Sequence, residues 1–163
     1  MIAIVKILAA GILIAGLNLP TLGLDGQPHL FPADLSQERA VVVVTFSKAA
    51  SEQATEWTRK LRENEKTLAA GIYQIAVLED VPAFFRAFVV SGLKRAIPKA
   101  LYDHFWIATS LSKEWQKQLR AESLDEAHVV VVEGRGEITW RFSGVFSEST
   151  LRSLLAALSG RKD

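Results

Sequence analysis

The sequence contains no cysteine. This absence excludes disulfide bonds, catalysis by a thiol and metal sites built from thiolates, because each of them depends on a cysteine sulfur. It does not identify the compartment in which the protein works, since an exported protein can lack disulfides.

The sequence also lacks an excess of charge of either sign. It has 19 lysine and arginine residues against 18 aspartate and glutamate residues, a formal net charge of +1. Nucleic-acid-binding domains usually carry a strong positive charge, so we predict no nucleic-acid partner. The histidines, His29, His104 and His128, are far apart in the sequence, and we predict neither a metal site nor another cofactor.

The first 23 residues differ from the rest of the chain. They contain one charge, Lys6, and then an apolar run from Ile7 to Leu17. This pattern is typical of a secretory signal peptide or of an uncleaved signal anchor. Thr21 and Gly23 place small residues three and one before a possible cut, while the uncharged stretch up to Leu24 is just long enough to span a bilayer. Both alternatives predict export to the periplasm or cell envelope.

Hydrophobic residues make up 49% of the whole chain, which is typical of a globular protein. After the N-terminal segment, the sequence predicts a linker at 24–39 and one globular domain at 40–160. The β-branched run from Ala40 to Phe46 predicts a strand covered on both faces. Ser51 is the expected N-cap of the next helix, with Glu52 in its first turn.

The later segments alternate between strand and helix patterns. In chain order they are a strand over 71–80, helical character over 81–105 interrupted at Gly92 and Pro98, a helix capped by Ser110 or Ser112, a β-hairpin over 128–144, and a last helix between Ser147 and Gly160. This order predicts an α/β fold with a mixed central sheet and helices on both faces.

The chain resembles the thioredoxin-like superfamily in this order and in two segments. VVVVTF resembles the strand that precedes the thioredoxin active site, and GEITWRFSGVFSESTLRSLLAAL resembles the closing strand and helix. The resemblance implies the three-layer thioredoxin fold. It places Ser51, Glu52, Gln53 and Ala54 at the position of the family's Cys-x-x-Cys motif, and His128 at the position of its cis-proline. Neither redox hallmark is present, so the family's thiol chemistry does not carry over.

A second resemblance is to the mitochondrial family of ATP synthase assembly factors, which use a thioredoxin-like domain. Short matches carry it: Ser47, Glu52, Gln53 and Trp57, the basic GLKRAIP segment at 92–98, and Gly136, Ile138, Trp140 and Gly144. This resemblance implies a role in assembly at a membrane.

Two kinds of site are open at the strand–helix junction. Ser51, with Ser47 and Lys48, could form a cleft for a thiol-independent enzyme or a small-ligand binder, with His128 as a base. The simpler interpretation is that Ser51 only caps the helix, and we expect its replacement by alanine to cost about 1 kcal/mol of stability and no catalytic rate. We favour this interpretation and predict no enzyme activity.

The middle of the chain is the other candidate site. Phe84, Phe85, Phe88 and Val89 give one helix an apolar surface, and Lys94 and Arg95 give it a basic end. Aromatics at helical spacing usually lie in the core, but these wrap more of a helix than one sheet face can cover. We therefore predict a surface for a protein partner in the envelope or at the membrane. The predicted function is a redox-inactive, exported binding or assembly module, held at the membrane if its N-terminal segment is uncleaved.

Overall fold

The computed structural model describes residues 18–160 except Arg135. In this part of the chain seven strands form one sheet in the order β2-β1-β5-β4-β3-β6-β7. The strands are β1 (Leu19–Gly23), β2 (Pro28–Phe31), β3 (Arg39–Thr45), β4 (Ile72–Val77), β5 (Phe105–Ala108), β6 (His128–Glu133) and β7 (Glu137–Ser143). The helices are α2 (Lys48–Arg62), α3 (Glu65–Ala70), α4 (Ala83–Ala96), α5 (Ser112–Leu119) and α6 (Glu148–Leu158), with a 3-10 turn η1 (Lys99–His104).

The sheet is mixed, as the sequence predicted. β3, β4 and β5 are parallel, whereas β6 runs antiparallel to β3, and β1 runs antiparallel to β5. β7 and β2 are the two edge strands. The carboxyl ends of β3, β4 and β5 therefore lie at the same edge of the sheet, which we call the carboxyl edge.

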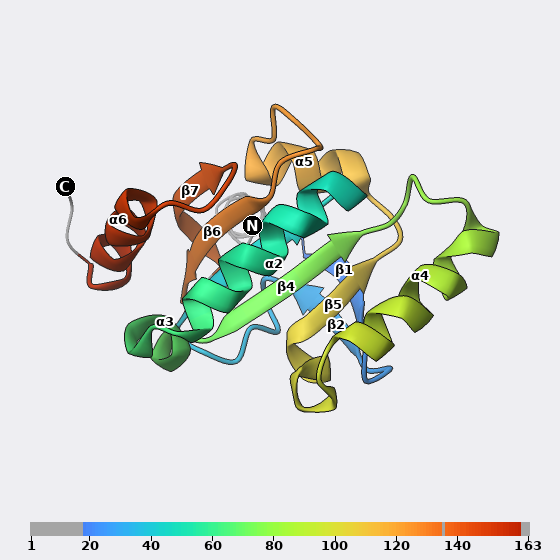
Figure 1. The fold of residues 1–163 in the computed structure, drawn as a ribbon, viewed down its shortest axis with the longest axis horizontal. Helices are drawn as coiled ribbons and strands as arrows, with labels where there is room; N and C mark the ends of the chain where they lie inside the picture. Colours follow the sequence, from blue (N-terminus) through green and yellow to red (C-terminus); the bar gives the residue numbers. More distant parts are fainter. Residues whose placement is uncertain (1–17, 135, 161–163) are drawn as a thin grey trace, which may run out of the picture.

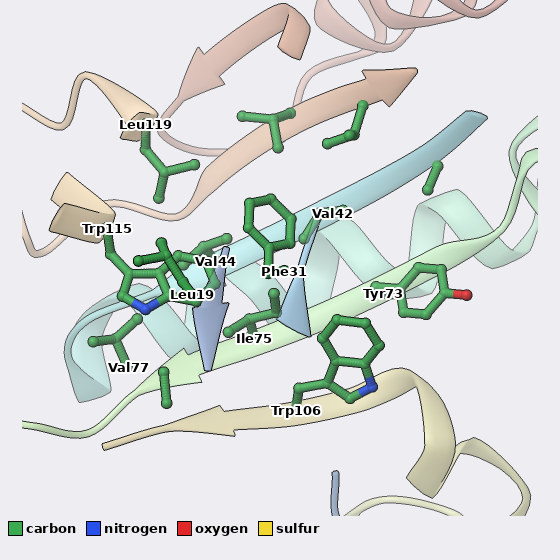
Figure 2. Close-up of a cluster of buried hydrophobic side chains, with 14 residues drawn as sticks. Leu19, Phe31, Val42, Val44, Tyr73, Ile75, Val77, Trp106, Trp115 and Leu119 are labelled. Atoms are coloured by element: carbon green, nitrogen blue, oxygen red, sulfur yellow. The ribbon is translucent and has the colours of Figure 1, made fainter. Parts of the chain in front are cut away.

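Hydrophobic clusters cover both faces of the sheet. On one face α5 packs against alternate residues of the central strands through Trp115 and Leu119, and Phe31 lies beside them (Figure 2). On the other face α2 and α6 cover β3 and β6 around Trp57, while α4 lies over β4 and β5. In Figure 1, α4 is the helix at the side of the molecule away from α6, and its first turn lies beyond the end of β4.

The start of the folded domain differs from the prediction. The sequence patterns predict a signal segment up to residue 23 and a linker over 24–39, but β1 and β2 lie in these ranges. Leu19 is fully buried and Leu22 pairs with Ile107, so β1 belongs to the sheet. Its short, uncharged sequence continues the composition of the preceding run, which hides the boundary. The expectations for residues 1–17 lie outside the described residues.

Two further elements differ from their predictions. β5 begins at Phe105, the last residue of the segment with predicted helical character, and continues through residues to which no element was assigned, because a four-residue strand buried on both faces shows no alternation. α4 continues through Gly92, where an interruption was predicted, and ends at Ala96, two residues before Pro98. None of the helices within residues 18–160 has the length and apolar character needed to cross a membrane.

Candidate functional site

The junction between β3 and α2 begins one turn earlier than predicted. Ser47 is the N-cap: its backbone is extended, and its Oγ accepts a hydrogen bond from the Ala50 backbone N–H at 3.1 Å. Ser51 lies inside α2, where its hydroxyl donates to the Ser47 carbonyl at 3.0 Å. The predictions that Ser51 caps the helix and that Glu52 lies in its first turn are therefore wrong, because β3 ends at Thr45 and the chain turns into the helix at once.

Of the four residues at the position of the redox motif, Gln53 and Ala54 contact other parts of the fold. Gln53 accepts a hydrogen bond from the Ala127 backbone N–H at 2.9 Å, which links α2 to the segment before β6. Ala54 is completely buried and Glu52 is exposed. The side chain of Gln53 thus occupies the space between the helix start and β6, where a cleft would have to open.

His128 lies on the other side of this space and is 1% exposed. Its Nε2 lies 2.9 Å from the Ser123 carbonyl, and its Nδ1 lies 2.8 Å from the Ser143 hydroxyl. These partners fit a neutral ring that donates from Nε2 and accepts at Nδ1. Burial lowers the pKa of His128, and the Ser123 carbonyl offsets only part of this effect. The ring packs edge-on against Phe46, with ring centroids 5.6 Å apart.

The proposed Ser51–His128 pair is not formed. Both ring nitrogens of His128 are hydrogen-bonded elsewhere, and the Ser51 hydroxyl is used within α2. The peptide bond before His128 is trans, as expected for a non-proline residue; among the described residues, the cis peptide bond is Phe31–Pro32. The contacts of Ser51 and His128 therefore hold elements of the fold together and do not join the two side chains.

Trp57, on α2, makes further contacts in the same region. Its indole Nε1 donates to the Gly144 carbonyl at 2.9 Å, and its ring packs against Phe142 and Phe146 at centroid distances of 5.7 and 5.1 Å. This contact secures the turn between β7 and α6. In the sequence, Trp57 and Gly144 are separate motif positions, and their pairing cannot be predicted because the residues are 87 positions apart.

The surface of α4 is the most exposed apolar feature among the described residues. The side chains of Phe84, Phe85 and Phe88 are 77%, 52% and 71% exposed, and no residue of α4 is buried. Lys94 and Arg95 are exposed in its last turn. Val89 belongs to the inner side, where it packs with Val90 and Leu93 over β5. The structure thus separates the predicted set into an outer aromatic surface and an inner contact.

Polar contacts to the backbone position α4 without burying it. Arg86 donates from Nε to the Val81 carbonyl and from Nη2 to the Glu79 carbonyl, both at 2.9 Å. At the other end, the Tyr102 hydroxyl donates to the Lys94 carbonyl at 2.5 Å. Arg86 and Tyr102 were not among the predicted site residues, since neither residue type nor spacing marks such a clamp.

A hollow of about 310 Å³ lies between α4 and β1. Its lining includes Leu22 and Leu24 from the N-terminal side, Ile107 from β5, and Val90 and Lys94 from α4. The sequence could not indicate it, because β1 itself was not predicted.

Comparisons with known proteins show which solved structures this architecture resembles. No protein-family model matches the chain, and no curated protein matches its sequence. Solved structures do match. The exposed lipoprotein thioredoxin of Streptococcus pneumoniae has a TM-score of 0.59 at 11% identity, over 86% of this chain and 99% of that one.

The thio-disulfide isomerase of Thermus thermophilus has a TM-score of 0.56 at 20% identity, over 91% of this chain and 96% of that one. A member of the Sco family of cytochrome c oxidase assembly proteins has a TM-score of 0.59 at 13% identity, over 90% and 94%. The fold is thioredoxin-like. At these identities the similarity establishes the fold alone, and the thioredoxin-like domain described here lacks the cysteines on which thiol redox chemistry depends.

Proposed function

We propose that the protein is a redox-inactive thioredoxin-like module of the cell envelope that binds a protein partner through the outer surface of α4. The observation that carries this proposal is the exposure of Phe84 and Phe88 on a helix with no buried residue. Exposed clusters of large apolar side chains are costly in water and commonly mark interaction sites. The filled space around Gln53 and His128 does not favour the alternative, a thiol-independent enzyme or small-ligand binder in the cleft.

The chemistry of the surface supports a particular kind of partner. The aromatic side chains require an apolar contact, and Lys94 and Arg95 favour acidic groups beside it. We therefore expect a partner segment that presents apolar residues followed by Asp or Glu. The N-terminal apolar run supports export, and two similar structures are described as an exposed lipoprotein and as an oxidase assembly protein. An assembly role like that of the ATP synthase assembly factors is one form that this function can take.

Site-specific photo-crosslinking tests the proposal. A photoreactive amino acid replaces Phe88 in one version of the full chain and Glu52, an exposed residue at the position of the redox motif, in a control version. We expect an adduct with one envelope protein from position 88 and none from position 52. The double variant Lys94→Glu, Arg95→Glu should reduce the adduct about tenfold by charge repulsion. An adduct at position 52 but not at 88 would shift the binding site to the cleft and overturn the proposal.

A further inference from the structure

The position of β1 in the sheet bears on the fate of the N-terminal segment. β1 is an inner strand that pairs with both β2 and β5. Leu19 is fully buried in the core, and Thr21 is 7% exposed. A cut after Gly23 would remove all of β1 and would separate β2 from its strand neighbour. We infer that this cut does not occur and that the apolar run from Ile7 to Leu17 stays attached to the folded domain.

The sequence offers no other suitable cut. Signal peptidases require small residues three and one before the cleaved bond. Between Lys6 and Asp25 this spacing occurs at Ala9 and Gly11 and again at Thr21 and Gly23. A cut after Gly11 would follow only five residues from Ile7, fewer than the roughly 7 that a signal peptide core needs. Every cut that fits the enzyme either lacks this core or destroys β1.

Retention of the segment places the domain close to the membrane. Only Asn18 lies between the apolar run and β1, so the chain has no spacer that could let the domain move away. The run has 11 residues, fewer than the roughly 20 of an ordinary membrane-spanning helix, so a run that inserts into the bilayer leaves the domain little slack. Both properties draw the amino end of β1 towards the bilayer surface.

The outer surface of α4 begins at the same edge of the sheet. Because β1 is antiparallel to β5, with Leu22 opposite Ile107, its amino end lies at the carboxyl edge. α4 follows β4 and starts beyond that edge (Figure 1). The hollow lined by Leu22 and Val90 shows that β1 and α4 are neighbours. Phe84, Phe85 and Phe88 are therefore held near the bilayer surface, a level at which interfacial helices present Trp, Phe and Leu on their apolar side.

This inference rests on the proposed function and narrows the partner. The segment that binds α4 belongs to a membrane protein and lies next to the bilayer surface. A soluble envelope protein or the lipid itself would be a different occupant, and the experiment separates these cases.

Intact mass measurement tests retention directly. The full chain with a C-terminal tag is exported in a bacterial host and purified from membranes. We expect a mature chain that still contains residues 7–17, recovered in the membrane fraction. A mature chain that starts at Leu24 overturns the inference whatever binds α4.

A spacer variant tests the position at the membrane. About 15 Gly and Ser residues are inserted after Asn18, with the photoreactive residue at position 88; the control carries the same residues after Asp163. Both chains keep the apolar run and the sheet, but only the first frees the domain from the bilayer. We expect the adduct with a membrane protein to fall at least about fivefold in the first chain, because the effective concentration drops, and to be unchanged in the control.

The outcomes separate the two proposals. An adduct of undiminished yield in the spacer variant, or one with a soluble protein, overturns the membrane-level partner while the proposed function stands. Adducts with lipid alone, or none in the unmodified chain, overturn the proposed function and the partner named here. In that case retention of the N-terminal segment is still decided by the mass.

Discussion

At the scale of single residues, the N-cap at the β3–α2 junction is Ser47, whereas the sequence suggested Ser51. Ser47 supplies the cap and Ser51 lies within the helix. The sequence shows only that two serines stand four positions apart after a strand; which of them caps depends on where the chain leaves the sheet.

The two serines provide a matched pair of variants. Ser47→Ala removes the acceptor for the Ala50 N–H and should lower the free energy of unfolding by about 1 kcal/mol. Ser51→Ala should change it by less than about 0.5 kcal/mol, because alanine favours the helix interior as much as the lost hydroxyl contact stabilises it. Urea denaturation of both variants measures the difference. A larger loss of unfolding free energy for Ser51→Ala than for Ser47→Ala would show that Ser51 is the N-cap, as the sequence predicted.

His128 makes the stability of the fold depend on pH. Burial lowers the pKa of His128 in the folded protein, whereas in the unfolded chain it titrates near its ordinary value of about 6.5. Between these two values the unfolded state binds more protons, so the free energy of unfolding falls as the pH drops below about 6.5 and levels off below the folded-state pKa.

The variant His128→Gln isolates this contribution. Urea denaturation at pH 7.5 and 5.5 should show a smaller fall in unfolding free energy for the variant than for the unmodified protein, since His29 and His104 are common to both. Equal falls would mean that the buried ring does not govern this pH range.

At the scale of elements, α4 combines helix formation with an unburied outer side. Its inner residues, Val90 and Leu93, contact the cluster over β5, and Arg86 ties its first turn to the backbone of the preceding loop. The aromatic content of this helix was evident from the sequence. Which side faced the sheet was not, because apolar residues surround most of the helix and give no amphipathic period.

Stability measurements distinguish the two sides of α4. The double variant Phe84→Ser, Phe88→Ser should change the free energy of unfolding by less than about 0.5 kcal/mol per site, since both side chains are already in water. Leu93→Ala, on the inner side, should cost about 1–2 kcal/mol for a partly buried side chain. Thermal or urea unfolding provides the comparison, and a large loss in the double variant would show that the aromatic side is packed in solution.

At the scale of the whole molecule, the sequence allowed the central part of the fold to be predicted but not its first two strands, β1 and β2. β3, α2, the β6–β7 hairpin and α6 follow local patterns, so a single sequence suffices for them. β1 and β5 are short strands whose identity depends on neighbours far along the chain. The filled cleft depends on contacts of the same kind: Gln53 reaches Ala127, which lies 74 positions later, and periodicity cannot indicate such a pairing.

The place of β1 in the sheet leads to a prediction for chains shortened at the N-terminus. A chain that starts at Asn18 should fold cooperatively, whereas one that starts at Leu24 lacks β1 and loses the fully buried Leu19 together with the pairing to β2 and β5. Loss of one buried leucine alone costs about 2–5 kcal/mol, which is a large share of the stability of a small domain. Near-ultraviolet circular dichroism and resistance to proteolysis compare the two chains. Equal folding would remove β1 from the essential sheet.

The pairing of β1 with β5 also sets an order for biosynthesis. The first strand of the domain has to wait for Phe105–Ala108 before it gains its inner neighbour, so the sheet cannot close until most of the chain has left the ribosome. During that interval Leu19 lacks the core that buries it in the folded domain. Under the proposed export, an unfinished sheet of this kind would keep the nascent chain open enough to pass through a translocation channel, and the domain would complete its folding on the far side of the membrane.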